Sequence, residues 1–136
     1  MNLLVLVLLL GAQERLSIPG GSVEVPPGCS AKGDQLIDVW EGSIDCPSPR
    51  RRIYIFAGPM AAPGCKGLPA SQGPVATVLT PQGHRLLICS SERKSGTQQV
   101  RKLIVDVGVS HLTTDVLDGR DATWLLSLAA TFEPTK

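Results

Sequence analysis

The residues of this chain with the clearest chemical potential are its four cysteines, because paired thiols cross-link a fold and thiolates bind metal. They are Cys29, Cys46, Cys65 and Cys89. A structural zinc site takes its ligands in close pairs, about two to four residues apart, and the gaps here are much longer. An even number of cysteines instead predicts two disulfides in an exported protein. Three pairings stay open, of which pairing in sequence order closes two loops of similar size.

Residues 1–12, MNLLVLVLLLGA, decide whether these cysteines meet an oxidising compartment. An apolar run closed by small residues and followed by polar ones is typical of a secretory signal. Because no Lys or Arg precedes the run, a buried first strand of an intracellular protein with free thiols is the alternative. The run is shorter than the roughly 20 residues that span a bilayer, so we expect no stable membrane anchor. The sequence therefore predicts a leader, one β-rich domain over residues 13–136, and a secreted or periplasmic location.

The two histidines raise the question of hydrolytic chemistry. His84 and His111 have no second ligand-type residue at a metal-binding spacing, and no G-x-S-x-G motif marks a nucleophile. We therefore expect both histidines to be exposed or ordinarily hydrogen-bonded. No phosphate-binding glycine loop is present, so we expect no cofactor. A small secreted hydrolase with dispersed catalytic residues is the alternative, and it needs a deep pocket that joins a histidine to an acid and a serine.

Three acids recur every third residue in the segment TTDVLDGRD, namely Asp115, Asp118 and Asp121. Closely spaced carboxylates near a glycine, here Gly119, are typical of calcium loops. The aspartate spacing and the final glutamate of an EF-hand are missing, however. We therefore expect these aspartates to shape turns and to cap secondary structure rather than to hold a metal.

The densest run of charge is Arg50-Arg51-Arg52, which follows Pro-Ser-Pro. Three guanidinium groups together can hold an anion or an acidic partner, and Lys66 would join them if Cys65 were brought near. The alternatives are a site for a processing protease, or a strand entrance whose arginines discourage pairing with other chains. The net charge of +1 gives no general attraction to nucleic acid or to an anionic membrane.

Short strands joined by turns must position these residues, because 14 glycines and 11 prolines interrupt the chain often. Alternation or β-favouring composition predicts strands at residues 22–25, 35–46, 52–58, 75–80, 84–90 and 100–109. Pro81-Gln82-Gly83 predicts a hairpin between the fourth and fifth of these, and the polar segment 92–99 predicts another hairpin tip. The long connection 58–74 indicates either a binding role or a loop that is held in place by a disulfide through Cys65.

The C-terminal third is expected to contain a strand, a connection and one element with two alternative structures. In residues 100–109 the face expected in the core consists of Arg101, Leu103, Val105, Val107 and Val109. Residues 110–121 are expected to form a turn-rich connection. Residues 121–132 alternate with a period of two, which favours a strand, and a helix capped by Asp121 is the alternative. Trp40 and Trp124 could stack on a sugar, but a chain with few aromatic residues is expected to keep both in its core.

These patterns predict an all-β fold, a small antiparallel β-sandwich or barrel of about seven short strands with two disulfides. We expect a non-enzymatic domain that binds a protein or a polyanionic macromolecule through the Arg50–Arg52 edge and the 58–74 loop. Besides the dispersed hydrolase, an open reading frame that was never selected for folding is an alternative, because the chain is rich in glycine and proline and has one asparagine.

Overall fold

The computed structural model describes residues 14–47, 49–59, 64–67 and 76–135, so the apolar segment 1–12 and most of the 58–74 connection lie outside the described residues. The elements are, in chain order, β1 (Arg15–Ile18), β2 (Gly21–Glu24), β3 (Ser30–Gln35), β4 (Trp40–Pro47), β5 (Arg50–Ala57), the 3-10 helix η1 (Cys65–Gly67), β6 (Ala76–Leu79), β7 (Arg85–Ser95), β8 (Gln98–Val107), β9 (Ser110–Val116), α2 (Gly119–Ala129) and β10 (Glu133–Pro134).

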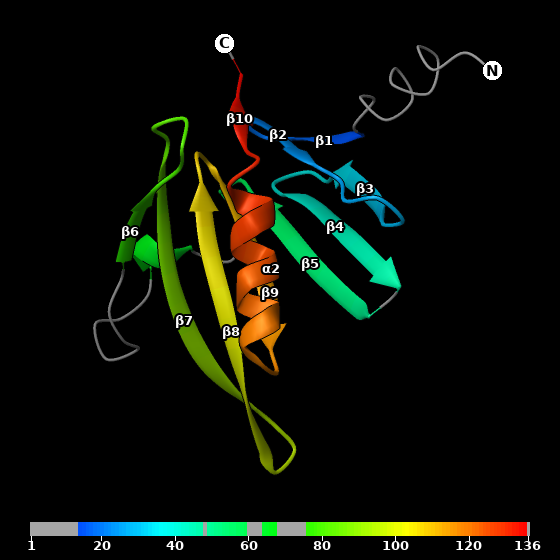
Figure 1. The fold of residues 1–136 in the computed structure, drawn as a ribbon, viewed down its shortest axis with the longest axis vertical. Coiled ribbons are helices and arrows are strands. Elements are labelled where there is room, and N and C mark those ends of the chain that lie inside the picture. The colour runs from blue at the N-terminus through cyan, green and yellow to red at the C-terminus, as the bar shows by residue number, and fades with distance from the viewer. Residues whose placement is uncertain (1–13, 48, 60–63, 68–75, 136) are drawn as a thin grey trace, which may run out of the picture.

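Two antiparallel sheets organise the described residues (Figure 1). The larger sheet has seven strands in the order β3-β4-β5-β9-β8-β7-β6, and the smaller sheet has three in the order β1-β2-β10. Neighbouring strands run antiparallel throughout both sheets. The prediction of an antiparallel, mainly β fold is therefore confirmed.

Helix α2 packs against β8 and β9 and covers one side of the larger sheet, beside the smaller sheet (Figure 1). We call this covered side the inner face and the opposite side the outer face. The main hydrophobic core lies between the inner face and its cover. Its largest fully buried side chains are Ile44, Ile53, Ile55, Val105, Val107 and Leu112 of the larger sheet, Val23 of β2 and Leu125 of α2.

The strand favoured over residues 121–132 is wrong, because the structure has helix α2 there. Asp118 caps the helix, and its carboxylate accepts a hydrogen bond from the backbone N–H of Arg120. Leu125, Leu128 and Ala129 are buried, which is the spacing of one helix face. Leucine and alanine favour helices, and the alternation that suggested a strand came from a segment that is apolar on both sides. No helix of the described residues is long and apolar enough to cross a bilayer.

The prediction of a turn-rich connection over residues 110–121 is also wrong. Most of this segment forms strand β9, which lies between β5 and β8. Thr113 and Thr114 are buried, and the Thr114 hydroxyl donates to the Arg52 carbonyl at 2.8 Å. Threonine is polar, which suggests a loop in the sequence. It is also β-branched, however, and suits a central strand when its hydroxyl is hydrogen-bonded. Val109 lies in the β8–β9 turn and is 63% exposed, so the prediction that it lies in the core is wrong as well.

The chain reverses inside the segment that was expected to form one strand at residues 35–46. The backbone N–H of Leu36 donates to the Val39 carbonyl at 2.8 Å, and Ile37 at the tip of this turn is 96% exposed. The strand that precedes the turn, β3, consists mostly of residues between the strands expected at 22–25 and 35–46, where Pro/Gly-rich turns were expected. Alternation within a segment does not show where a chain turns back, so the hairpin β3–β4 was missed.

Two other hairpins confirm their predictions. Strands β6 and β7 pair around Pro81-Gln82-Gly83, where Gly83 has the positive φ of +86° that a tight turn requires. Strands β7 and β8 pair around Gly96, inside the polar segment 92–99, although both strands continue further into that segment than expected. This long hairpin extends beyond the rest of the larger sheet (Figure 1).

Candidate functional site

All four cysteines are in disulfides, and they pair in sequence order, Cys29 with Cys46 and Cys65 with Cys89. The first bridge ties the residue before β3 to β4. The second ties η1 to the outer face of β7, where Cys65 is almost completely buried. The cysteines therefore fasten two segments to the larger sheet, and they supply neither a free thiolate nor a zinc site.

His111 and Asp106 lie directly opposite one another on β9 and β8, on the outer face of the sheet. The His111 Nδ1 atom is 2.7 Å from one carboxylate oxygen of Asp106, and the backbone N–H of Cys65 donates to the other oxygen at 2.9 Å. Gly64 lies so close that a Cβ atom there would overlap both side chains. The pair thus holds the η1 segment on the sheet.

This pair does not form a catalytic triad with the described residues. The neighbouring Ser110 hydroxyl donates to the Pro19 carbonyl at 2.7 Å, and no described serine is hydrogen-bonded to His111. The other histidine, His84, lies at the β6–β7 turn, where its backbone N–H donates to the Thr80 hydroxyl. His84 therefore lies at a turn, and His111 lies in the contact that holds η1 on the sheet.

The aspartates of the TTDVLDGRD segment serve the start of α2. The Asp118 side chain caps the helix, and the Asp121 carboxylate accepts from the backbone N–H groups of Leu117 and Asp118 at 2.8 and 3.1 Å. This reciprocal capping box confirms the expected cap and turn roles of these two residues. Within the described residues, no group of three His, Cys, Asp or Glu side chains is arranged to hold a metal ion.

The three consecutive arginines point to different sides of the molecule, because residues of a strand alternate between its faces. Arg51 lies on the inner side, 3.2 Å from the Asp121 carboxylate and 5.7 Å from the centre of the Trp124 ring. Arg52 lies on the outer face, and Arg50 is exposed at the start of β5. The arginines therefore do not form one continuous guanidinium surface.

Arg52 is held by two neighbours on the outer face. Its guanidinium forms an ion pair with Asp45, donates to the Tyr54 hydroxyl at 3.2 Å, and lies 5.6 Å from the centre of the Tyr54 ring. Hydrogen bonds to Tyr54 and to Asp45 raise the pKa of Arg52 above its ordinary value. Lys66 lies on η1, which contacts β7 and β8, so the described contacts do not bring it to the arginines.

The outer face of β3, β4 and β5 is hollowed into a groove of about 480 Å³, which we call the outer-face groove. The residues that line it are Lys32, Gly33, Asp34 and Leu36, then Glu41, Gly42 and Ser43, then Arg52, Tyr54 and Phe56. The rings of Tyr54 and Phe56 are nearly parallel, with centres 6.3 Å apart. A groove with aromatic and charged side chains is thus present where no described segment covers the sheet.

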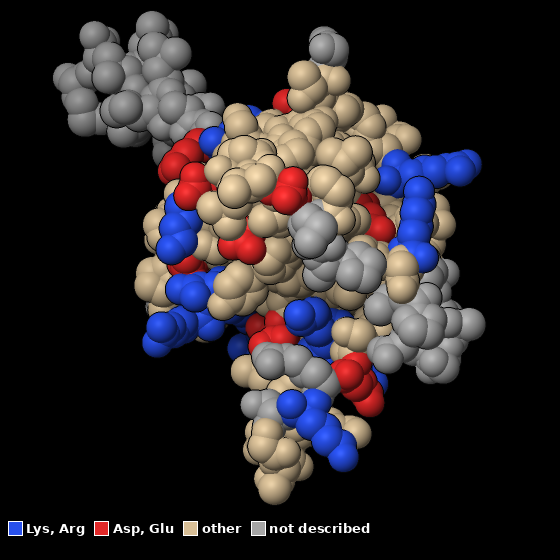
Figure 2. Space-filling model, turned by 180° about the vertical axis from the view of Figure 1, so that it is seen from behind, with Lys and Arg blue, Asp and Glu red and all other residues tan. Residues whose placement is uncertain are grey.

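Basic and acidic side chains are interspersed around this groove. Lys32 and Arg52 contribute positive charge, whereas Asp34 and Glu41 contribute negative charge. Figure 2, which views the molecule from behind, shows the two signs mixed over this side rather than separated into patches. The groove therefore offers ion-pair partners of both signs next to aromatic surface.

Sequence reasoning missed the groove because it needs three strands in register. The alternation of Arg52, Tyr54 and Phe56 was visible in the sequence and marks one face of β5. The opposite wall comes from β3, most of which lies between the strands expected at 22–25 and 35–46, so Lys32 and Asp34 had no assigned neighbours. Comparison with models of protein families, with curated proteins and with solved structures finds no match to this chain.

Proposed function

We propose that this chain is an exported, non-enzymatic domain that binds a segment of another protein in the outer-face groove. The observation that carries the proposal is the groove itself: about 480 Å³ of hollowed sheet surface with two neighbouring aromatic rings, free of any described covering segment. Ligand sites are concave surfaces that combine apolar area with a few placed polar groups, and this surface has both.

The charges of the groove favour a protein segment over a polyanion. Of the two positive groups, Arg52 is already paired with Asp45, and Asp34 and Glu41 would repel a row of phosphates or sulfates. Arg51 is directed to the other side of the sheet, where Asp121 holds it. A peptide that carries side chains of both signs and an apolar residue would find partners for all of them.

The aromatic residues are the expected source of binding energy. Tyr54 is 44% exposed, which is high for so large an apolar ring. Tyrosine is among the residues most enriched at binding hot spots, because it buries much area at a low cost in conformational entropy. Arg52 supports this ring from one side and Phe56 from the other, so the ring is already ordered before a ligand arrives.

The two disulfides support the proposed export, because such bridges form and persist mainly in oxidising compartments. They also fit a binding role, since each fastens a segment next to the outer face. Cys29–Cys46 secures the start of β3, which forms one wall of the groove, and Cys65–Cys89 secures η1.

Selection of a phage-displayed random peptide library on the immobilised domain tests the proposal. We expect the enriched peptides to bind Tyr54→Ala at least about tenfold more weakly than the unchanged domain, because this variant removes a ring that fills the interface. Lys94→Ala, on the distant β7–β8 hairpin, is the matched surface control and should bind normally. Circular dichroism checks that both variants fold. If no peptide is enriched, or if the enriched peptides bind Tyr54→Ala unchanged, the groove is not the binding site.

A further inference from the structure

Strand β3 forms one edge of the seven-stranded sheet, so its backbone is paired on one side. Five of its six residues are exposed, and Ala31 is partly buried. Strand β1 comes close to β3, and five of the six β3 residues remain exposed beside this contact. An edge of this kind is a ready template for another strand unless proline, a bulge or unmatched charge protects it.

The register of the β3–β4 hairpin fixes which backbone groups are free. The N–H of Leu36 donates to the Val39 carbonyl, so Leu36 and Val39 occupy a hydrogen-bonded position, and the two types of pair then alternate along the ladder. Ala31, Gly33 and Gln35 therefore occupy non-hydrogen-bonded positions with respect to β4. Their N–H and carbonyl groups point away from β4, towards the open edge.

The charge pattern on either side of Gly33 is complementary to itself. Two copies of β3 can pair antiparallel about a two-fold axis at Gly33. Lys32 of the first copy then lies opposite Asp34 of the second, and Asp34 of the first copy lies opposite Lys32 of the second. The free groups of Gly33 then form the central hydrogen-bonded pair. Lys32 and Asp34 fall at the adjacent non-hydrogen-bonded pairs, where facing side chains are closest.

We propose that the edge of β3 is a homodimerisation site, at which two copies of this chain join their larger sheets through antiparallel β3–β3 pairing centred on Gly33. A two-fold interface requires a patch that complements itself, and Lys32-Gly33-Asp34 meets this requirement. The pairing places Lys32 and Asp34 on the outer face of both copies, so two outer-face grooves lie side by side. The dimer does not depend on what the groove binds.

A disulfide and an aromatic ring also fix the conformation of β3 at this edge. The Cys29–Cys46 disulfide ties the chain just before β3 to β4. The Trp40 indole lies against Gly33 and against its partner Gly42, where an added Cβ atom at either glycine would overlap the ring. Six residues on each side make a small interface, so the dimer is weak and forms as the concentration rises.

Sedimentation velocity over a range of protein concentrations tests this inference with charge-reversal variants. Lys32→Glu places Glu opposite Asp34 of the second copy, and Asp34→Lys places Lys opposite Lys32. We expect each single variant to weaken dimerisation roughly tenfold, because both symmetric pairs become repulsive. The double variant Lys32→Glu/Asp34→Lys restores opposite charges at both pairs and should dimerise like the unchanged chain.

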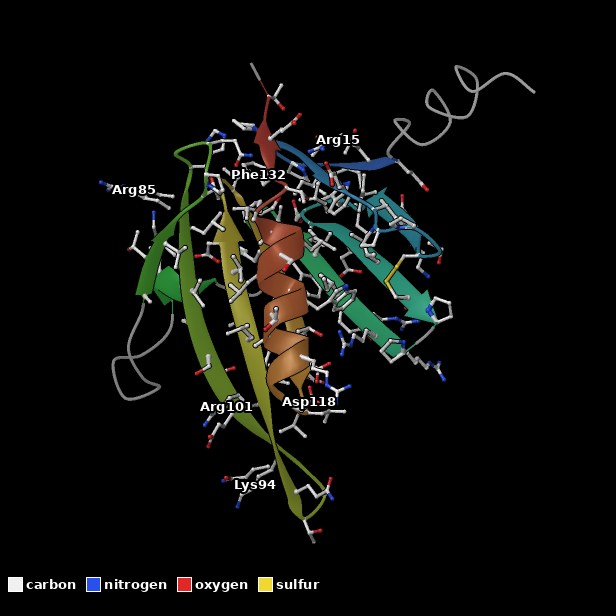
Figure 3. All side chains as sticks on the ribbon, viewed as in Figure 1. Arg15, Arg85, Lys94, Arg101, Asp118 and Phe132 are labelled. Atoms are coloured by element: carbon white, nitrogen blue, oxygen red, sulfur yellow. A yellow bond between two sulfur atoms is a disulfide. The ribbon has the colours of Figure 1, made fainter. Side chains whose placement is uncertain are left out.

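Lys94→Glu is the matched control, since it makes the same change of charge at an exposed site on the β7–β8 hairpin, far from β3 (Figure 3). It should dimerise normally, and thermal unfolding checks that every variant is folded. An unchanged chain that stays monomeric up to millimolar concentration overturns the inference. So does a double variant that is no better than the single ones, because Lys32 and Asp34 then do not lie opposite each other across the interface.

Discussion

Asp106 and His111 face each other across the β8–β9 ladder, and the carboxylate of Asp106 joins the imidazole to the backbone of Cys65. Asp106 is 7% exposed, so its carboxylate lies where an unpaired charge would be costly. Both of its oxygens have partners. The pair, together with the Cys65–Cys89 bridge, therefore holds η1 on the outer face.

Replacing Asp106 by alanine should lower the free energy of unfolding by about 1–3 kcal/mol, since it leaves the buried N–H of Cys65 without its acceptor. Urea denaturation followed by circular dichroism measures the change. Asp38→Ala removes the same carboxylate from the exposed β3–β4 turn and is the control, with an expected effect within about 0.5 kcal/mol. Equal stability of the two variants would show that the Asp106 contacts contribute little.

Gly64→Ala tests the close packing of the η1 segment on the same pair. An added Cβ atom would overlap the Asp106 carboxylate and the His111 ring, so a loss of about 1–3 kcal/mol is expected from overpacking. Gly119→Ala is the matched control, because a Cβ atom at this first residue of α2 meets no atom within 4 Å. Thermal unfolding of both variants gives the comparison. A stable Gly64→Ala protein would mean that the η1 segment moves aside easily.

Removal of the Asp118 side chain should weaken α2, which begins next to it (Figure 3). Asp118→Ala loses the hydrogen bond to the Arg120 N–H, and the expected cost is about 0.5–2 kcal/mol. Asp118→Asn keeps an oxygen that can accept this bond and should retain most of the stability. Urea denaturation distinguishes the two. Equal loss in both variants would show that the charge, rather than the cap, stabilises this end of the helix.

Local chemistry explains which parts of the fold the sequence predicts well. Proline and glycine at positions 81 and 83 define the β6–β7 turn by their backbone preferences, and Asp118 and Asp121 act on backbone groups within four residues of themselves. The even number of cysteines predicts two disulfides, whereas the sequence left their pairing open, and the structure shows that they pair in sequence order. In the turn and in the helix cap, the residues that matter are near one another in the chain.

Tertiary contacts decide the parts that the sequence leaves open. Thr113 and Thr114 become part of a central strand because β5 and β8 pair on either side of β9. Ile104 lies on the outer face yet is buried, because η1 and its disulfide cover it there. The outer-face groove requires β3, which is stabilised as a strand by pairing with β4 rather than by its own composition.

Alanine substitutions of three leucines test helix α2 against the strand that its alternation favours. In the helix Leu125 is completely buried, Leu126 is partly buried and Leu117 before it is 86% exposed. Leu125→Ala should therefore cost about 2–5 kcal/mol, because it leaves a cavity under α2, whereas Leu117→Ala should change stability by less than about 0.5 kcal/mol. Leu126→Ala should fall between them. In a strand, Leu126 would face the core and Leu125 would not, so urea denaturation that ranks Leu126→Ala as the more damaging change would contradict the helical packing.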